Sequence, residues 1–119
     1  MMNVFPNSGN VSLYLLKAKL GSDRVGNQLL ELLSSKQVVG SASSITSKEF
    51  YSSLQSKVQV DLKVSIPCIL YSKHKYVYIP REDTIYKVER TYLNGMNLEL
   101  YLSSTSIHKE EVKNWNLLN

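Results

Sequence analysis

Apolar and polar side chains alternate most regularly between positions 58 and 66 of the chain. A period of two is typical of a β-strand with one buried and one exposed face, because successive side chains point to opposite sides. The apolar series is Val58, Val60, Leu62, Val64 and Ile66, and the polar series between them is Gln59, Asp61, Lys63 and Ser65. Pro67 lacks a backbone donor, so we expect an edge or a bulge after this strand.

Two further strand candidates precede this segment. Residues 11–20 place Lys17 and Lys19 on one face, and the other face is apolar or aromatic. The members of that apolar face are Tyr14, Leu16, Ala18 and Leu20. Residues 21–27 are rich in Gly, Ser, Asp and Asn, which predicts a reversal of the chain and therefore a hairpin.

Residues 28–35, which would form the second arm of that hairpin, are ambiguous. Their leucines, at positions 29, 30, 32 and 33, would satisfy a helix as readily as a strand, and local propensity favours a helix. The turn before the segment and the sequence Val38-Val39-Gly40 after it, which contains no helix stop, favour a strand. We therefore predict a strand.

A helix start interrupts the β pattern near the middle of the chain. Thr46 and Glu49 have the spacing of a capping box. In this motif the threonine hydroxyl accepts a hydrogen bond from the backbone N–H of Glu49, and the glutamate carboxylate accepts one from the backbone N–H of Thr46. The apolar residues of this helix are Phe50, Tyr51 and Leu54, and Ile45 has the staple spacing to Phe50. The pattern predicts a short helix over about residues 46–56.

The second half of the chain contains three more strand candidates. Residues 75–79 and 84–93 read as strands, separated by a break at residues 80–83. Within the second of these, one predicted face carries Tyr86, Val88, Arg90 and Tyr92. Asn94-Gly95 then predicts a type I′ hairpin, because both residues tolerate positive φ. The partner strand continues with Leu98, Leu100 and Leu102.

The chain becomes polar from Ser103 onward, and residues 107–119 are predicted to form a short tail helix. Trp115 near its end has two interpretations, a plug for the core or a contact for another chain. Both stay open.

Together these segments predict a mainly β fold of about six strands, with one short α-helix inserted between the second and third. Short strands at regular spacing indicate a small antiparallel β-barrel or sandwich. We expect the barrel, because closure leaves no edge that invites aggregation. The predicted division is an N-terminal arm over residues 1–10, a barrel over 11–104 and a C-terminal tail over 105–119.

Composition narrows the class of protein. With 119 residues, of which 43% are hydrophobic, the chain suits one domain with one core. The net charge of +4 is spread along the chain, which suits solubility or passing contact with nucleic acid. Cys68 is the lone cysteine, lies among apolar neighbours and is expected to be a small core residue in a reducing compartment. No membrane span or signal peptide is recognised, so a cytosolic site of synthesis is expected.

Catalytic chemistry is not indicated by the sequence. His74 and His108 are the only histidines, and neither lies near the cysteine or a group of carboxylates. Lys73 and Lys75 flank His74, so a positive field should disfavour its protonation. No zinc spacing, phosphate-binding glycine loop or nucleophile elbow occurs. We therefore expect a protein that is not an enzyme and that holds no cofactor or metal.

Several of the eight tyrosines lie beside cations. These groups are Tyr71 and Tyr76 around Lys73 and Lys75, and Tyr86 and Tyr92 around Arg90. On a small barrel, such aromatic and basic residues could stack and hold single-stranded nucleic acid. The alternative is that tyrosine simply fits a half-buried pleated surface.

The order of motifs resembles the head-tail joining proteins of tailed bacteriophages, also called head closure or stopper proteins. The likeness covers roughly residues 11–104. Its carriers are the turn at 23–27, the segment from Ser44 to Tyr51, the strand Tyr86-Lys87-Val88-Glu89-Arg90-Thr91-Tyr92 and the strand Leu98-Glu99-Leu100-Tyr101.

The resemblance implies a structural virion protein. Such proteins form a ring, commonly of twelve copies, that closes the DNA channel after packaging and presents the surface on which the tail docks. The implied neighbours are a portal or adaptor protein above, a tail completion or terminator protein below, and packaged double-stranded DNA in the channel. The implied locations are the head-tail interface of the virion and, during assembly, the host cytoplasm, with no membrane.

Candidate sites follow from this resemblance and from the leucine-rich second strand. The candidates for subunit contacts or the channel face are Thr46, Lys48, Glu49, Phe50, Tyr51, Leu54, Leu29, Leu32 and Trp115. The candidates for proximity to DNA are Lys73 and Lys75. Binding of single-stranded nucleic acid by a small barrel is the alternative function.

Overall fold

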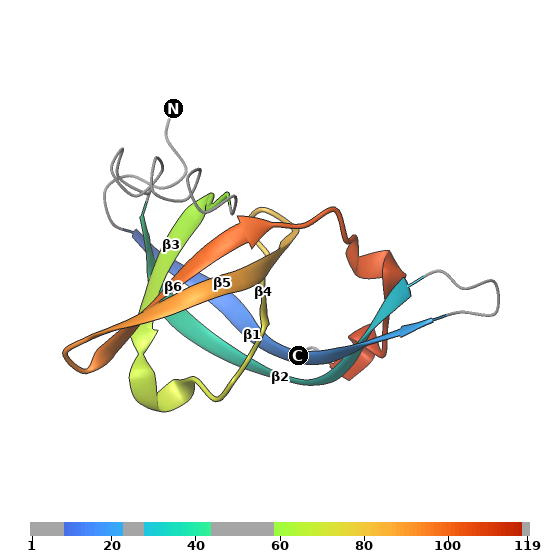
Figure 1. Cartoon of the computed structure of the whole chain (residues 1–119), viewed down its shortest axis with the longest axis horizontal. Coiled ribbons are helices and arrows are strands. Elements are labelled where there is room, and N and C mark those ends of the chain that lie inside the picture. Colours follow the sequence, from blue (N-terminus) through green and yellow to red (C-terminus); the bar gives the residue numbers. More distant parts are fainter. Residues whose placement is uncertain (1–8, 23–27, 44–58, 118–119) are drawn as a thin grey trace.

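The computed structural model describes residues 9–22, 28–43 and 59–117, and these form seven strands and three 3-10 helices (Figure 1). The strands are β1 (Gly9–Ser22), β2 (Gln28–Ser43), β3 (Leu62–Pro67), β4 (Tyr76–Ile79), β5 (Thr84–Asn94), β6 (Asn97–Ser104) and β7 (Val112–Lys113). The helices are η1 (Cys68–Leu70), η2 (Lys109–Glu111) and η3 (Trp115–Leu117). The helix predicted at 46–56 lies outside the described residues.

Six strands close into a ring, which we call the strand ring. Hydrogen-bonded neighbours follow the order β1, β4, β5, β6, β3, β2, and β2 pairs again with β1. Every pair in this ring is antiparallel. The mainly β prediction is confirmed, and β2 confirms the strand predicted at 28–35. β1 begins at Gly9, so the last two residues of the predicted arm belong to the first strand.

The interior of the strand ring is filled by alternate residues from all six strands, which we call the inner core. Its buried members are Val11, Leu13, Leu15, Val38, Ala42, Leu62, Val64, Ile66, Val77, Ile79, Tyr86, Leu100 and Leu102. The alternation predicted for the third strand is confirmed where it is described, because its apolar residues from Val60 to Ile66 are all buried. Gly40 lets β2 approach β3, since a Cβ there would lie 2.8 Å from Cγ1 of Val64.

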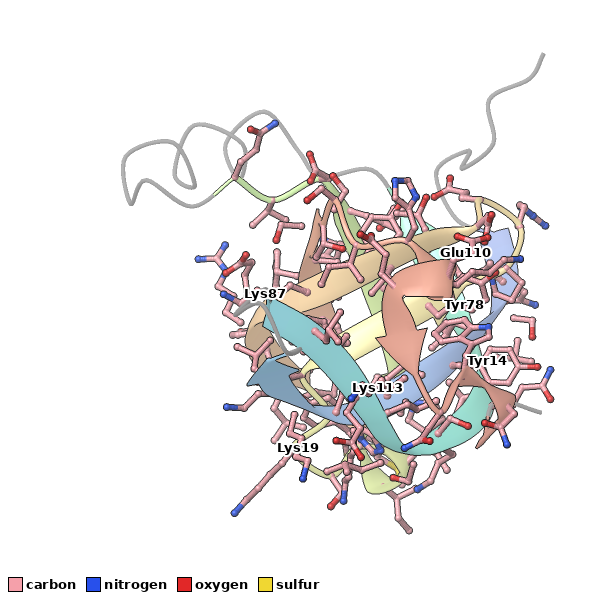
Figure 2. All side chains as sticks on the ribbon, turned by 90° about the vertical axis from the view of Figure 1, so that its right-hand side faces the viewer. Tyr14, Lys19, Tyr78, Lys87, Glu110 and Lys113 are labelled. Carbon is pink, nitrogen blue, oxygen red and sulfur yellow. The ribbon has the colours of Figure 1, made fainter. Side chains whose placement is uncertain are left out.

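A second apolar cluster, which we call the outer core, lies on the outside of the strand ring. Its buried members are Leu16, Leu30, Leu32, Tyr78, Ile85 and Val112. The half-buried residues packed on it are Tyr14, Ala18, Tyr76, Ile107 and Trp115. The C-terminal segment covers this face, and Tyr14 and Tyr78 lie beside it (Figure 2). β1 is therefore buried on both faces through much of its length.

That double burial corrects the two-faced interpretation of β1. Tyr14, Leu16 and Ala18 do share an apolar face, but Leu20 at its end is 59% exposed. The opposite face, expected to be the lysine face, carries the β1 residues of the inner core. A strand covered on both sides reads as a near-continuous apolar run, and alternation alone underestimates its burial.

A bulge in β5 corrects a second prediction. Val88 pairs with Leu102, but Arg90 pairs with Tyr101, which leaves Glu89 as an extra residue. Side chains beyond the bulge therefore change faces. The residues predicted to share a face, Tyr86, Val88, Arg90 and Tyr92, do not: the first two face the inner core, and the last two point outward with Tyr101.

The hairpin between β5 and β6 forms as predicted, but its turn is displaced by one residue. Asn94 pairs with Asn97, so the two central residues are Gly95 and Met96. Gly95 has a φ of 65°, and neither Asn94 nor Met96 has a positive φ. One glycine with positive φ at the first central position fits a type II′ turn and does not fit the type I′ turn expected from Asn94-Gly95.

The predicted tail helix is wrong for the described residues of the tail. Residues 109–117 form two 3-10 turns separated by β7. Backbone pairing of β7 with β2, in parallel at Leu30↔Val112, replaces helical hydrogen bonds. Asn114 has a φ of 64°, which a right-handed helix does not allow. Within the part of the chain described, no helix is long and apolar enough to cross a bilayer.

Candidate functional site

A groove with a volume of about 460 Å³ lies between the loop at residues 71–75 and the middle of β5. Four cationic side chains line it, and we call it the cationic groove. They are Lys73, Lys75, Lys87 and Arg90. The first two are the DNA-proximal candidates of the sequence, and the structure adds a lysine and an arginine from a distant strand.

The backbone brings these cations together in two ways. The amide N–H of Val88 donates to the carbonyl oxygen of Lys75 at 2.9 Å, which fastens the loop to β5. The bulge at Glu89 turns Arg90 outward, onto the face that carries the groove. Because a bulge inserts one residue without a distinct sequence signal, the contribution of Arg90 could not be read from alternation.

The charges of the groove are poorly neutralised. Among the described residues, the side-chain ammonium groups of Lys73, Lys75 and Lys87 make no hydrogen bond or ion pair. Glu89 is the acidic residue of the lining, and its carboxylate accepts a hydrogen bond from the Ser103 hydroxyl. In the described part of the lining, four cations therefore share the groove with one carboxylate, which makes the groove attractive to anions.

Arg90 is held differently from the lysines. Its guanidinium carbon lies 4.4 Å from the centroid of the Tyr101 ring. A guanidinium stacked on an aromatic face keeps its N–H edge available and loses part of its freedom. Lys63 approaches the same ring at 5.8 Å. Tyr101 thus orients two cations on the outside of the strand ring.

His74 forms the buried base of the loop. Its side chain is only 3% exposed, and Nδ1 accepts the Ser72 backbone N–H at 3.1 Å. The Tyr71 hydroxyl donates to the carbonyl oxygen of His74 at 2.5 Å. Burial first, and the charges of Lys17 and Lys36 second, lower the pKa of His74 to about 4. The sequence predicts that Lys73 and Lys75 disfavour protonation of His74. In the structure, burial and two lysines distant in sequence have this effect.

Two lysines from the long hairpin support this loop. The Lys17 ammonium donates to the Ser72 hydroxyl at 3.4 Å, and the Lys36 ammonium donates to the Leu70 carbonyl at 3.2 Å. Lys17 belongs to β1 and Lys36 to β2, so they tie the loop and the end of η1 before it to the β1–β2 hairpin. Lys17 and Lys36 could not be recognised from the sequence, because each lies in a strand far along the chain from the residue that it contacts.

The tyrosines expected around these cations divide into two groups. Tyr71 and Tyr76 line the groove, whereas Tyr86 and Tyr92 do not. Tyr86 is 7% exposed in the inner core, and burial, together with a hydrogen bond to Glu82, raises the pKa of its hydroxyl. Tyr92 lies further along β5, opposite Glu99. Only the Tyr71 and Tyr76 group is therefore brought together with several cations.

Neither groove tyrosine presents a free ring. Tyr71 is half-buried against the inner core and lies 5.7 Å from the His74 ring. Tyr76 is half-buried against the outer core. A base needs an open aromatic face for stacking, so these rings serve mainly as packing groups.

The remaining candidate residues lie elsewhere. Leu32 is fully buried in the outer core and offers no surface to a partner. Trp115 is half-buried and packs edge-to-face on Tyr78, with ring centroids 4.9 Å apart, as a core plug would. Thr46, Lys48, Glu49, Phe50, Tyr51 and Leu54 lie outside the described residues.

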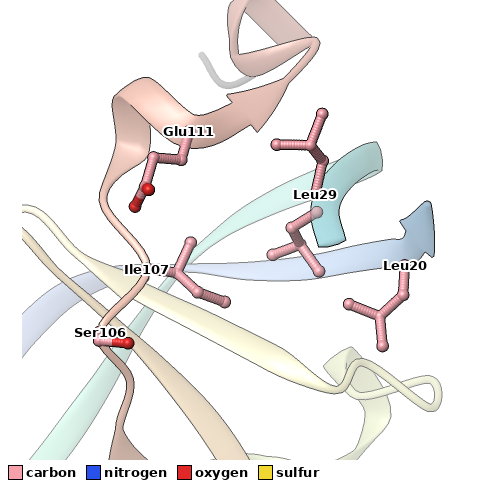
Figure 3. A pocket seen from close by; sticks show the side chains of 6 residues that line it. Leu20, Leu29, Ser106, Ile107 and Glu111 are labelled. Atoms are coloured by element: carbon pink, nitrogen blue, oxygen red, sulfur yellow. The ribbon is translucent and has the colours of Figure 1, made fainter. Parts of the chain in front are cut away.

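Leu29 lines a pocket of mixed apolar and polar character at the far end of the long hairpin. The pocket has a volume of about 250 Å³ and is formed by the end of β1, the start of β2 and the tail (Figure 3). Leu20 and Ile107 face Leu29 across it, and Glu111 lies at its rim (Figure 3).

Exposed apolar residues collect at both ends of the molecule. The β5–β6 hairpin and the β1–β2 hairpin lie at opposite ends of its long axis (Figure 1). The β5–β6 end exposes Leu93 and Met96, and Ile69 of η1 is close to it because the Cys68 N–H donates to the Met96 carbonyl. Cys68 itself, expected in the core, is only half-buried. The other end exposes Leu20 and Leu33.

A scan against protein-family models finds no match for the chain, and a search of curated proteins finds no similar sequence. Among the described residues, no group of three or more His, Cys, Asp or Glu side chains could hold a metal ion.

Proposed function

We propose that this protein is a subunit of the head-tail connector of a tailed bacteriophage. In this role a small β-barrel assembles into an oligomeric ring that closes the portal channel after DNA packaging and provides the tail attachment surface. Its neighbours would be a portal or adaptor protein on one side and a tail completion or terminator protein on the other. The function is structural and requires no catalysis.

The observation that carries this proposal is that two of the motifs that carry the resemblance pair with each other across one hairpin. The Arg-Thr-Tyr segment of β5 pairs residue by residue with the Glu-Leu-Tyr segment of β6. The pairs are Arg90↔Tyr101, Thr91↔Leu100 and Tyr92↔Glu99. Arg90 also stacks on Tyr101. The two segments therefore form a single cross-strand unit, which agrees with the proposal.

The distribution of apolar surface supports assembly. A closed ring of identical copies needs two different patches that meet head to tail. The exposed Leu93 and Met96 at one end, and the exposed Leu20 and Leu33 beside a pocket at the other, are two such patches. Large exposed apolar side chains gathered in patches are typical of interaction sites.

Deletion of the gene in its phage tests the proposal. We expect packaged heads that lose DNA or fail to join tails, both visible by electron microscopy of the lysate, and rescue by the gene supplied in trans. Normal infectious particles from the deletion would contradict the proposal.

A second candidate function is binding of single-stranded nucleic acid. It is favoured by the presence of Tyr71 and Tyr76 with four cations in one groove. It ranks second because both rings are half-buried against the two cores. Tight binding to a single-stranded oligonucleotide that is lost in a Tyr76→Ala variant would move it to first place.

A further inference from the structure

We infer that the cationic groove binds the phosphate backbone of double-stranded DNA. This inference deepens the proposed function and rests on it only for the source of the DNA, which would be the packaged genome. The groove itself is defined by four side chains, Lys73, Lys75, Lys87 and Arg90, from the loop at 71–75 and from β5.

The state of the cations favours an anionic ligand. The ammonium groups of the three lysines make no ion pair or hydrogen bond within the described part of the chain. The carboxylate of Glu89 is engaged by the Ser103 hydroxyl, and His74 beneath the loop is buried. Lysine ammonium groups bind phosphate as mobile point charges, and an arginine supplies a planar fork of donors.

The groove is also organised before any ligand arrives. The Lys75 carbonyl accepts the Val88 N–H, and the Tyr71 hydroxyl and Ser72 N–H both bond to His74. Arg90 is stacked on Tyr101. A preformed loop and an oriented guanidinium reduce the ordering cost of binding.

The aromatic residues favour a backbone contact over base stacking. Tyr71 packs on the inner core and beside His74, and Tyr76 packs on the outer core. Single-strand binding proteins depend on open aromatic faces, whereas duplex binding without sequence preference depends on cations that meet phosphates. The groove has cations that can meet phosphates and lacks open aromatic faces among its described residues, so it suits a duplex better than a single strand.

The test compares two variants with equal net charge. The groove variant carries Lys73→Gln, Lys75→Gln and Lys87→Gln. The control variant carries Lys19→Gln, Lys109→Gln and Lys113→Gln, in β1 and the tail, and these lysines do not line the groove. Lys87 lies apart from Lys19 and Lys113 (Figure 2). Binding is measured by fluorescence anisotropy with a short labelled DNA duplex and the matching single strand, between about 50 and 200 mM salt.

For the wild type, four phosphate contacts predict a slope of log affinity against log salt of about −3.6. The groove variant should bind at least about ten-fold more weakly, with a slope near −0.9, because one cation of the four remains. The control should keep the affinity and slope of the wild type. If the triple variant does not fold, Lys87→Gln against Lys113→Gln should still differ in slope by about 0.9.

Three results would overturn the inference: equal losses in both variants, no loss in either, or tighter binding of the single strand than of the duplex. Failure here is distinguishable from failure of the connector proposal. A connector that closes the channel without this groove would still give defective particles on deletion. DNA binding by the groove would persist in a protein whose deletion leaves infectivity intact.

Discussion

The inner and outer cores bury similar kinds of side chain but are built in opposite ways. The inner core takes alternate residues from six strands that are joined to one another around a closed ring. The outer core joins one face of β1, β2, β4 and β5 to a tail whose strand pairing with the sheet is limited to the two residues of β7. The inner core is therefore surrounded by strands on all sides. The outer core is covered by one segment, the C-terminal tail, which acts as a flap.

This difference implies a hierarchy of stability. Local opening occurs first where few backbone hydrogen bonds and few buried contacts hold a segment. The tail has two 3-10 turns and a two-residue strand, whereas the inner core is crossed by strands of up to sixteen residues. We expect the outer core to open while the inner core stays folded.

Replacement of Leu100 by Ala should have the largest effect. Leu100 is fully buried in the inner core, in the centre of β6 between β5 and β3. The lost burial and the remaining cavity should lower the free energy of unfolding by about 3 to 5 kcal/mol, measured by urea denaturation. Leu93→Ala is the matched control, because Leu93 is 60% exposed, and it should cost less than about 0.5 kcal/mol. Equal losses would contradict the assignment of Leu100 to a closed interior.

Acid should weaken the loop that rests on the inner core. The pKa of His74 is about 4 in the folded protein and near 6.5 when the chain is unfolded, so the unfolded chain binds more protons between these values. The stabilising effect of neutral His74 is complete above about pH 6.5 and is lost as the pH falls toward 4. Up to about 3 kcal/mol is involved.

The measurement is the free energy of unfolding from urea titrations at several pH values. A His74→Gln variant should have a flatter dependence between pH 6.5 and 4 than the wild type. His108→Gln, at an exposed position, is the control for the loss of a histidine elsewhere in the chain. An unchanged dependence in the His74→Gln variant would contradict this role.

The contrast between the inner and outer cores also explains which parts of the fold could be predicted from the sequence. Regular alternation along β3 identified inner-core residues correctly, because in that strand period two maps directly onto two faces. The tail was misassigned as a helix, since its conformation depends on pairing with Leu30, some eighty positions earlier. Long-range pairing of this kind overrides local propensity.

The candidate site was predictable only in part. Lys73 and Lys75 were identified because they lie in a polar turn that two tyrosines flank. Lys87 lies beside them because the Val88 N–H donates to the Lys75 carbonyl, which fastens β5 to the loop. Arg90 lies there because the β5 bulge turns its side chain outward. Both features are set by register, and register is fixed by the whole sheet. The choice between stacking and packing roles for the tyrosines was left open by the sequence for a related reason, because burial of each ring depends on which core lies beneath it.

Replacement of Trp115 by Ala gives a smaller effect and distinguishes the two cores most directly. Trp115 is half-buried and packs edge-to-face on Tyr78, so its loss should lower the free energy of local opening of the tail by about 1 to 2 kcal/mol. Amide hydrogen exchange should accelerate in β7 and leave β3 and β6 unchanged. Trp115→Phe keeps an aromatic edge on Tyr78 and should recover part of the protection. Equal acceleration in β6 would mean that the two cores unfold as one cooperative unit, and the flap would then be an integral part of the closed ring.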